Sequence, residues 1–106
     1  MLVEFSDRAV ARLQEIEDYI AERGHPHTAV AFVGALVQQA SALGPVAESL
    51  RAFYVSPATG YAYRSFPHRG YRIVYVALDE RVIVVDLFHG SRSPDGLMAS
   101  LSAYEP

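Results

Sequence analysis

Cysteine and lysine are both absent from this chain of 106 residues. Without cysteine the protein has neither a disulfide nor a thiolate nucleophile, which suits a cytoplasmic protein without requiring one. Without lysine every basic side chain is an arginine, so mechanisms that need an amine side chain are excluded. The four histidines are scattered without the spacing of metal ligands, and we expect no metal or other cofactor.

Long apolar runs are also missing. No stretch approaches the roughly 20 apolar residues that a membrane-spanning helix needs, so we expect no membrane segment. The first ten residues, MLVEFSDRAV, lack the basic start and apolar run of a signal peptide. Because 51% of the residues are nevertheless apolar, we predict one folded domain over residues 1–106.

The net charge of −3 conceals an uneven distribution. Residues 1–50 hold three arginines against seven acids, a net charge of −4. Residues 51–92 hold six arginines against three acids, a net charge of +3, and residues 93–106 add two acids. An anionic partner would therefore meet the C-terminal half, although bulk attraction to nucleic acid is weak for an acidic protein.

Hydrophobic spacing predicts a strand followed by two helices. Leu2–Phe5 alternates apolar and polar residues, as a short strand does. A helix begins after Ser6 as its N-cap and ends at Gly24. Its apolar positions are Val10, Leu13, Ile16 and Ile20, flanked by Ala9 and Tyr19. Pro26 opens a second helix that stops at Gly44-Pro45, so the two helices form an antiparallel hairpin.

The rest of the chain is predicted to form a sheet. Residues 45–60 show no clean period, which indicates a loop with room for one short strand. Tyr61–Phe66 alternates as a strand, and the turn Pro67–Gly70 leads into the most apolar segment, Tyr71–Arg92. That segment is broken once, at Asp79-Glu80, and we interpret it as a β-hairpin.

A short helix is predicted after Ser93, with Leu97, Met98 and Leu101 as its buried positions. The element order is then strand, helix, helix and three further strands. We therefore predict a two-layer α+β fold, in which the helical hairpin packs on an antiparallel sheet of about four strands.

A polar cluster ends the predicted β-hairpin. With Asp79-Glu80 as a two-residue turn, Arg72 lies opposite Leu87 and shares its face with His89. Arg92 follows closely, so we take Arg72, His89 and Arg92 as a candidate anion- or phosphate-binding site. Arginine forks bind oxyanions, and a histidine can move a proton near neutral pH. The alternative is structural, with the arginines paired to acids and His89 bonded to backbone.

Carrying the pairing back across the turn Pro67–Gly70, with Phe66 opposite Tyr71, places other polar side chains. Tyr63 and Ser65 fall beside Arg72, whereas Arg64 falls on the opposite face in the row of Asp86. We interpret Arg64 and Asp86 as a structural pair, because an acid within a central strand needs a partner. A slip of one residue would reverse these faces.

The element order, the phrase YRIVY at residues 71–75 and the phrase HGSR at residues 89–92 resemble the RelE/ParE superfamily of type II toxins. The helical hairpin matches as well, so the resemblance covers nearly the whole chain. It implies a cytoplasmic toxin that is neutralised by a cognate antitoxin in a hetero-oligomer. RelE-like members cut mRNA on the ribosome, whereas ParE-like members poison DNA gyrase and cut nothing themselves.

Carried over residue by residue, the resemblance puts Arg72 and Arg92 at arginines that either activity can use. The RelE-type lysines fall at Tyr63 and Ser65, neither of which is basic. The RelE-type tyrosine falls near Met98. Phosphodiester cleavage needs charge stabilisation together with positioned proton transfer, and this chain keeps only part of that set.

Residues 87–97, LFHGSRSPDGL, resemble the ParE branch, which commonly has a histidine, a glycine and an arginine there before a short helix. The acidity of the chain points the same way, because a ribosome ligand relies on basic surface. We expect a ParE-like, non-enzymatic inhibitor of DNA gyrase. Two alternatives stay open: a RelE-like endoribonuclease using Arg72, His89 and Arg92 on ribosome-bound mRNA, and an inactive toxin fold that only binds its antitoxin.

Overall fold

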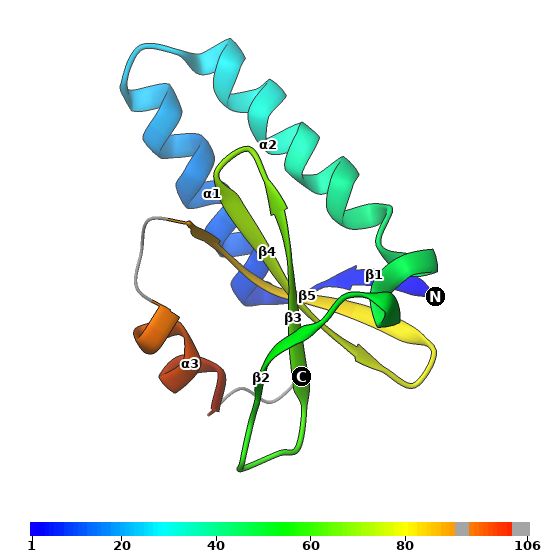
Figure 1. Cartoon of the computed structure of the whole chain (residues 1–106). Coiled ribbons are helices and arrows are strands. Elements are labelled where there is room, and N and C mark those ends of the chain that lie inside the picture. The colour runs from blue at the N-terminus through cyan, green and yellow to red at the C-terminus, as the bar shows by residue number, and fades with distance from the viewer. Residues whose placement is uncertain (91–93, 103–106) are drawn as a thin grey trace.

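The computed structural model describes residues 1–90 and 94–102, and its α+β architecture confirms the predicted fold class. Figure 1 shows a helical hairpin, a twisted sheet and a short helix on the other side of that sheet. In chain order the elements are β1 (Leu2–Phe5), α1 (Asp7–Glu22), α2 (Pro26–Ser41), the 3-10 helix η1 (Gly44–Ser49), β2 (Ala52–Val55), β3 (Ala62–His68), β4 (Tyr71–Leu78), β5 (Arg81–His89) and α3 (Pro94–Ser102). Among the described residues no helix has the length and apolar character needed to cross a bilayer.

The sheet has five strands in the order β1-β5-β4-β3-β2. Strands β2 to β5 pair antiparallel, as predicted, but β1 pairs parallel to β5, so the sheet is mixed rather than antiparallel. Alternation of apolar residues shows which side chains face the core, but it carries no information on the direction of a strand. Residues 45–60 were predicted to be a loop that could contain one short strand. That strand is β2, at the edge of the sheet.

Capping residues define the helical hairpin as predicted. The Ser6 side chain accepts a hydrogen bond from the Ala9 amide at 3.1 Å, and its hydroxyl donates to the Val85 carbonyl at 3.0 Å. This one side chain therefore both starts α1 and ties it to β5. Gly24, with a φ of +88°, lies in the turn after α1, and Pro26 opens α2.

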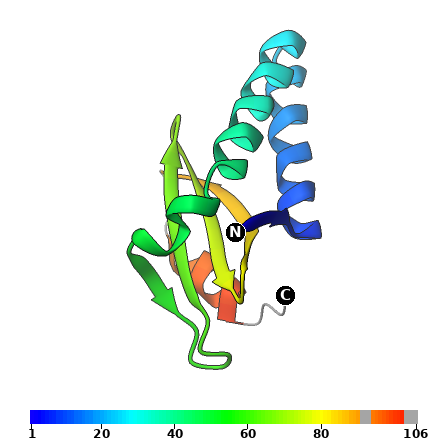
Figure 2. The ribbon, with the colours of Figure 1, turned by 90° about the vertical axis from the view of Figure 1, so that its right-hand side faces the viewer.

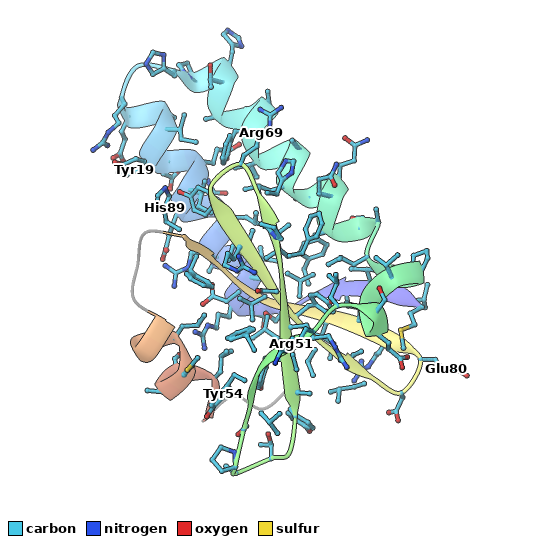
Figure 3. The ribbon with its side chains drawn as sticks, viewed as in Figure 1. Tyr19, Arg51, Tyr54, Arg69, Glu80 and His89 are labelled. Carbon is cyan, nitrogen blue, oxygen red and sulfur yellow. The ribbon has the colours of Figure 1, made fainter. Side chains whose placement is uncertain are left out.

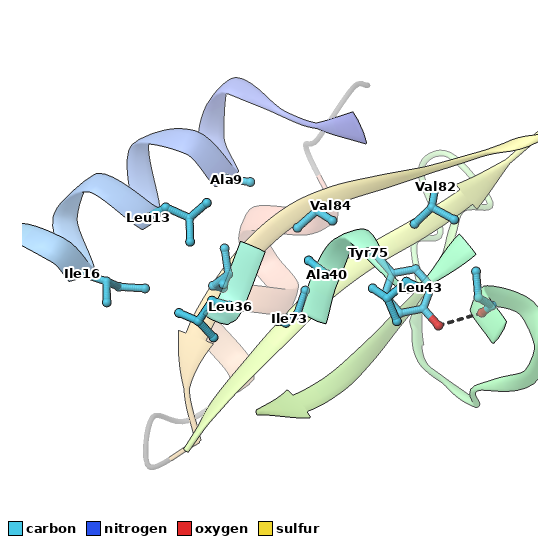
Figure 4. Packing of buried hydrophobic residues seen from close by; sticks show 12 residues of the cluster. Ala9, Leu13, Ile16, Leu36, Ala40, Leu43, Ile73, Tyr75, Val82 and Val84 are labelled. Atoms are coloured by element: carbon cyan, nitrogen blue, oxygen red, sulfur yellow. Dashed lines mark hydrogen bonds between the residues drawn. The ribbon is translucent and has the colours of Figure 1, made fainter. Parts of the chain in front are cut away.

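The hairpin packs on one face of the sheet and extends beyond it (Figure 2). The buried residues between these layers are apolar and come from both: Ala9, Leu13, Ile16, Leu36, Ala40, Leu43, Ala47, Ile73, Tyr75, Val82, Val84 and Leu87. Figure 4 shows this packing and a side-chain hydrogen bond within it, in which the Tyr75 hydroxyl donates to the Ala47 carbonyl at 2.7 Å. Val10 and Tyr19 were predicted in the apolar stripe, yet each is 55% exposed, because they lie at the margins of the face that the sheet covers.

Helix α3 covers the opposite face of the sheet. Leu101 is fully buried there, as predicted, while Leu97 and Met98 are half-buried. The strand residues that it meets belong to a second apolar cluster, made of Tyr63, Val74, Val76, Ile83 and Val85. The Tyr63 hydroxyl donates to the Leu101 carbonyl at 3.4 Å. The sheet therefore has helices packed on both of its faces.

Candidate functional site

A β-bulge in β5 determines where the polar side chains of the sheet point. Val74 of β4 lies opposite Asp86, but the next residue, Tyr75, lies opposite Val84. Val85 is therefore an extra residue on the β5 side. An extra residue shifts the side-chain alternation by one, so the part of β5 after the bulge has its faces reversed relative to an unbroken strand.

Between the turn and the bulge, the predicted register of β4 and β5 is confirmed, since Leu78 pairs with Arg81 across the turn. After the bulge the prediction is wrong, because Arg72 lies opposite Phe88 rather than Leu87. Leu87 packs in the cluster beneath the helical hairpin, whereas Phe88 packs in the cluster beneath α3.

Arg72 and His89 consequently lie on opposite faces of the sheet, and the prediction that they share a face is wrong. The His89 ring stands edge-on to Tyr71 on the hairpin side, with 5.2 Å between ring centroids. Arg72 lies on the α3 side, where its Nε donates to the Ser65 hydroxyl at 2.9 Å. The third predicted residue, Arg92, falls outside the described residues. A bulge within a run of apolar β-branched residues leaves no mark in the sequence, so this separation could not be foreseen.

The predicted neighbours of Arg72 differ in accessibility. Ser65 shares its face and binds it directly. Tyr63 is on the same face but is fully buried against α3. Arg72 and Ser65 line an open groove of about 580 Å³, together with Arg51 and Phe53 from the start of β2 and with other residues of β2 and β3. This groove is the position at which Arg72 can meet a ligand.

Asp86 occupies a separate polar cluster beside the bulge, and its carboxylate is only 1% exposed. Arg8 donates to Oδ2 through Nε at 3.0 Å and Nη2 at 2.9 Å, and Arg12 donates to Oδ1 through Nε at 3.0 Å. The hydrogen bond to Asp86 is the main cause of a raised pKa at Arg12, which stays charged. The predicted partner, Arg64, instead donates to the Leu50 carbonyl. Asp86 therefore does need a partner, but α1 supplies two.

A second hollow, of about 160 Å³, lies between α1 and the ends of β4 and β5. Ile16, Tyr19, Tyr71 and His89 are among the residues that line it, and Figure 3 shows Tyr19 and His89 at the same end of the molecule. The guanidinium of Arg23 stacks 3.7 Å from the centre of the Tyr19 ring. Sequence reasoning placed Tyr19 in the core and missed this hollow, whose volume suits one apolar or aromatic side chain of a partner.

The comparisons with known proteins agree with this architecture. A family model described as "ParE toxin of type II toxin-antitoxin system, parDE" matches residues 3–94. Among solved structures, a chain of "Chromosomal ParDE TA system from P. aeruginosa" superposes with a TM-score of 0.68. That alignment covers 84% of this chain and 95% of the other at 18% sequence identity, so it shows the fold alone. No match was found among curated proteins.

Proposed function

The chain belongs to the ParE toxin family of type II toxin–antitoxin systems, and from this premise we propose that it inhibits DNA gyrase in the cytoplasm. A cognate antitoxin holds it inactive in a hetero-oligomer. In this proposal the toxin binds its target and cuts no nucleic acid.

The observation that supports binding over cutting is that, among the described residues, no histidine shares the face of Arg72 and the one carboxylate on that face is enclosed. Cleavage of a phosphodiester requires an acid and a base within hydrogen-bond reach of the reacting atoms. The strand pairing places His68 and His89 on the hairpin face, opposite to Arg72. The described residues on the face of Arg72 include Ser65, the enclosed Tyr63 and Asp86, which lies diagonal to it across β4 and β5. The Asp86 carboxylate is enclosed and bound by Arg8 and Arg12, so Arg72 can attract an anion while this acid is poorly placed to act as a base.

We assign binding roles to the predicted site residues accordingly. Arg72 contacts an anionic group of a partner in the groove on the α3 side. His89 contributes to the aromatic hollow beside Tyr19, which receives a side chain from a partner. Arg92 follows β5 closely in sequence and is proposed as a further cationic contact. These residues serve as contacts of a binding protein, each on its own part of the surface.

The hairpin offers the surface on which a helix of the antitoxin can lie. Helix α2 contains no aspartate, glutamate or arginine, and its Val30 is 63% exposed. Val10 of α1 adds a further exposed apolar side chain. Exposed apolar side chains on the surface of a helical hairpin are what an amphipathic partner helix can cover.

The test compares the two targets with one preparation of the purified toxin. We expect loss of gyrase supercoiling and accumulation of gyrase-cleaved DNA, while mRNA on programmed ribosomes stays intact. Cleaved mRNA with unaffected gyrase would establish the RelE-like alternative instead. Induction of the toxin in cells with and without the antitoxin provides the control, because an inactive binding module would not stop growth in either case.

A further inference from the structure

Arg51 and Arg72 line the groove beside the start of β2, and Arg64 lies near the same point on the opposite face of the sheet. The ion pairs of the described residues use Arg8 and Arg12 on α1 and Arg81 on β5. Arg51, Arg64 and Arg72, in contrast, have no carboxylate of the described residues within 4.0 Å. This part of the surface therefore carries positive charge that the described chain does not neutralise.

The fold holds two of these guanidinium groups through Nε alone. Arg72 donates Nε to the Ser65 hydroxyl at 2.9 Å, and Arg64 donates Nε to the Leu50 carbonyl at 2.8 Å. Both side chains are half-buried, so the bonds fix their direction. The Nη atoms of Arg72, which form the outer part of the fork, remain available to a ligand. The site is thus oriented before any partner arrives.

The surrounding sequence strengthens the positive potential. Residues 51–78 contain four arginines and no acid, although the whole chain has a net charge of −3. The nearest preceding acid is Glu48, which is exposed and forms no ion pair with these arginines. Charge of one sign gathered on one part of an acidic protein favours a partner of the opposite sign at that place.

The walls of the groove are apolar, which narrows the kind of partner. Leu50, Phe53 and Pro67 line it together with Arg51 and Arg72, and its volume is about 580 Å³. Figure 3 shows Arg51 extending beside the start of β2. Strand β2 is only four residues long and bulged, so it offers little backbone for pairing, and side chains must carry the recognition.

We propose that this groove binds an acidic, extended segment of the antitoxin, in which carboxylates alternate with apolar side chains. A carboxylate takes the outer nitrogens of Arg72 and is flanked by the charge of Arg51. A neighbouring apolar side chain packs against Phe53 and Pro67. The identity of the partner rests on the proposed function, whereas the chemistry of the segment rests on the groove.

A protein segment fits this groove better than a nucleic acid does. Nucleic-acid affinity comes from several phosphate contacts, and two arginines in one groove supply few of them. Apolar walls reward an aliphatic or aromatic side chain, which a phosphate backbone does not offer. The acid-rich helix α1, which carries five carboxylates, would also repel a long polyanion.

The experiment measures affinity between the purified antitoxin, encoded beside the toxin, and four forms of the toxin. These are the wild type, Arg51→Glu, Arg72→Gln and the control Arg81→Glu, which reverses an exposed charge at the turn between β4 and β5, outside the lining of the groove. We expect Arg51→Glu to weaken binding about tenfold at low salt, with a smaller difference at 500 mM NaCl. Arg81→Glu should stay within about twofold. Circular dichroism establishes that each variant is folded, and Arg51 is exposed, so its replacement leaves the core intact.

Each outcome decides the matter. If the wild type and Arg51→Glu bind the antitoxin equally, the groove is not the docking site, while the toxin–antitoxin pairing itself stands. If the wild type does not bind the antitoxin at all, both proposals about that partner are overturned. If a 20-base-pair DNA duplex binds the wild type and loses binding in Arg51→Glu, the ligand is a nucleic acid and the peptide proposal is wrong. In a charge-swap experiment, an acidic residue of the antitoxin is changed to arginine and the variant is combined with the Arg51→Glu toxin. Restored affinity would identify the acid that pairs with Arg51.

Discussion

Asp86 gathers two arginines of α1 around one carboxylate at the bulge in β5. Arg8 and Arg12 are four residues apart, so they project from the same side of the helix. Their side chains are about one-third exposed, so solvent reaches the charges and lowers the contribution of each ion pair to stability. The carboxylate itself is enclosed, and it also accepts the Leu87 amide at 2.7 Å. One acid thus fixes both the bulge and the position of α1.

Replacing Asp86 with asparagine should destabilise the domain, because two guanidinium groups would then face a neutral amide. Removal of one partner from a buried pair costs about 3–5 kcal/mol, and the partial exposure of the arginines reduces our expectation to about 2–3 kcal/mol. Urea denaturation gives the free energy of unfolding. The matched control is Glu4→Gln, which breaks the exposed pair with Arg81 and should cost under about 0.5 kcal/mol. Equal losses in the two variants would contradict the structural role of Asp86.

Tyr75 makes the stability of the protein depend on pH in the alkaline range. Burial raises the pKa of its hydroxyl above the ordinary value of 10.0, and the charge of Arg64 partly opposes this shift. The native state therefore keeps the proton of Tyr75 to a higher pH than the unfolded chain does. The contribution of Tyr75 to stability is complete below about pH 10 and falls as the pH rises from there towards the folded pKa. We expect Tyr75→Phe to lose about 1–2 kcal/mol at pH 7, because the Ala47 carbonyl loses its donor. The same variant should show a shallower decline between pH 9.5 and 11 in urea denaturation, and an unchanged slope would refute this origin.

Among the elements, α3 depends most on tertiary packing. It has nine residues, includes Gly96, and begins where the family match ends at residue 94. An isolated helix of this length is marginal in water, so its contact with the sheet must hold it in place. The fully buried Leu101 supplies much of that contact.

Leu101→Ala should therefore loosen α3 while leaving the hairpin and the sheet folded. The loss of buried apolar volume should lower the free energy that holds α3 on the sheet by about 2–3 kcal/mol. A helix of nine residues cannot lose that much and stay packed on the sheet. Hydrogen exchange should show α3 amides exchanging at least about tenfold faster, with β4 and β5 protected as before. Ser100→Ala is the control, because Ser100 is exposed on the same helix. A uniform loss of protection across all elements would mean that α3 folds as one unit with the sheet.

At the scale of the whole molecule, the sequence predicts what depends on local pattern. The N-cap at Ser6, the turn beside Gly24 and the turn between β4 and β5 follow from residue type and periodicity, and the structure confirms them. The direction of β1 depends on the path of the whole chain. The reversal of faces after Val85 depends on one extra residue in an otherwise largely apolar strand. Alternation of apolar and polar residues reveals neither the direction of a strand nor the position of a bulge. For that reason the candidate site was the least predictable part of the molecule.

The parallel pairing of β1 with β5 also has a consequence for how the protein is made. Ser6, at the end of β1, meets Val85 across 79 residues of chain. The helical hairpin relies on contacts near in sequence and can form early, whereas β1 has no partner until β5 has been synthesised. At about 5–20 residues per second, a ribosome needs roughly 4–17 s to reach that point. A nascent chain that stops before β5 therefore leaves β1 unpaired and the core open, so this domain can act on a target only after β5 has been synthesised.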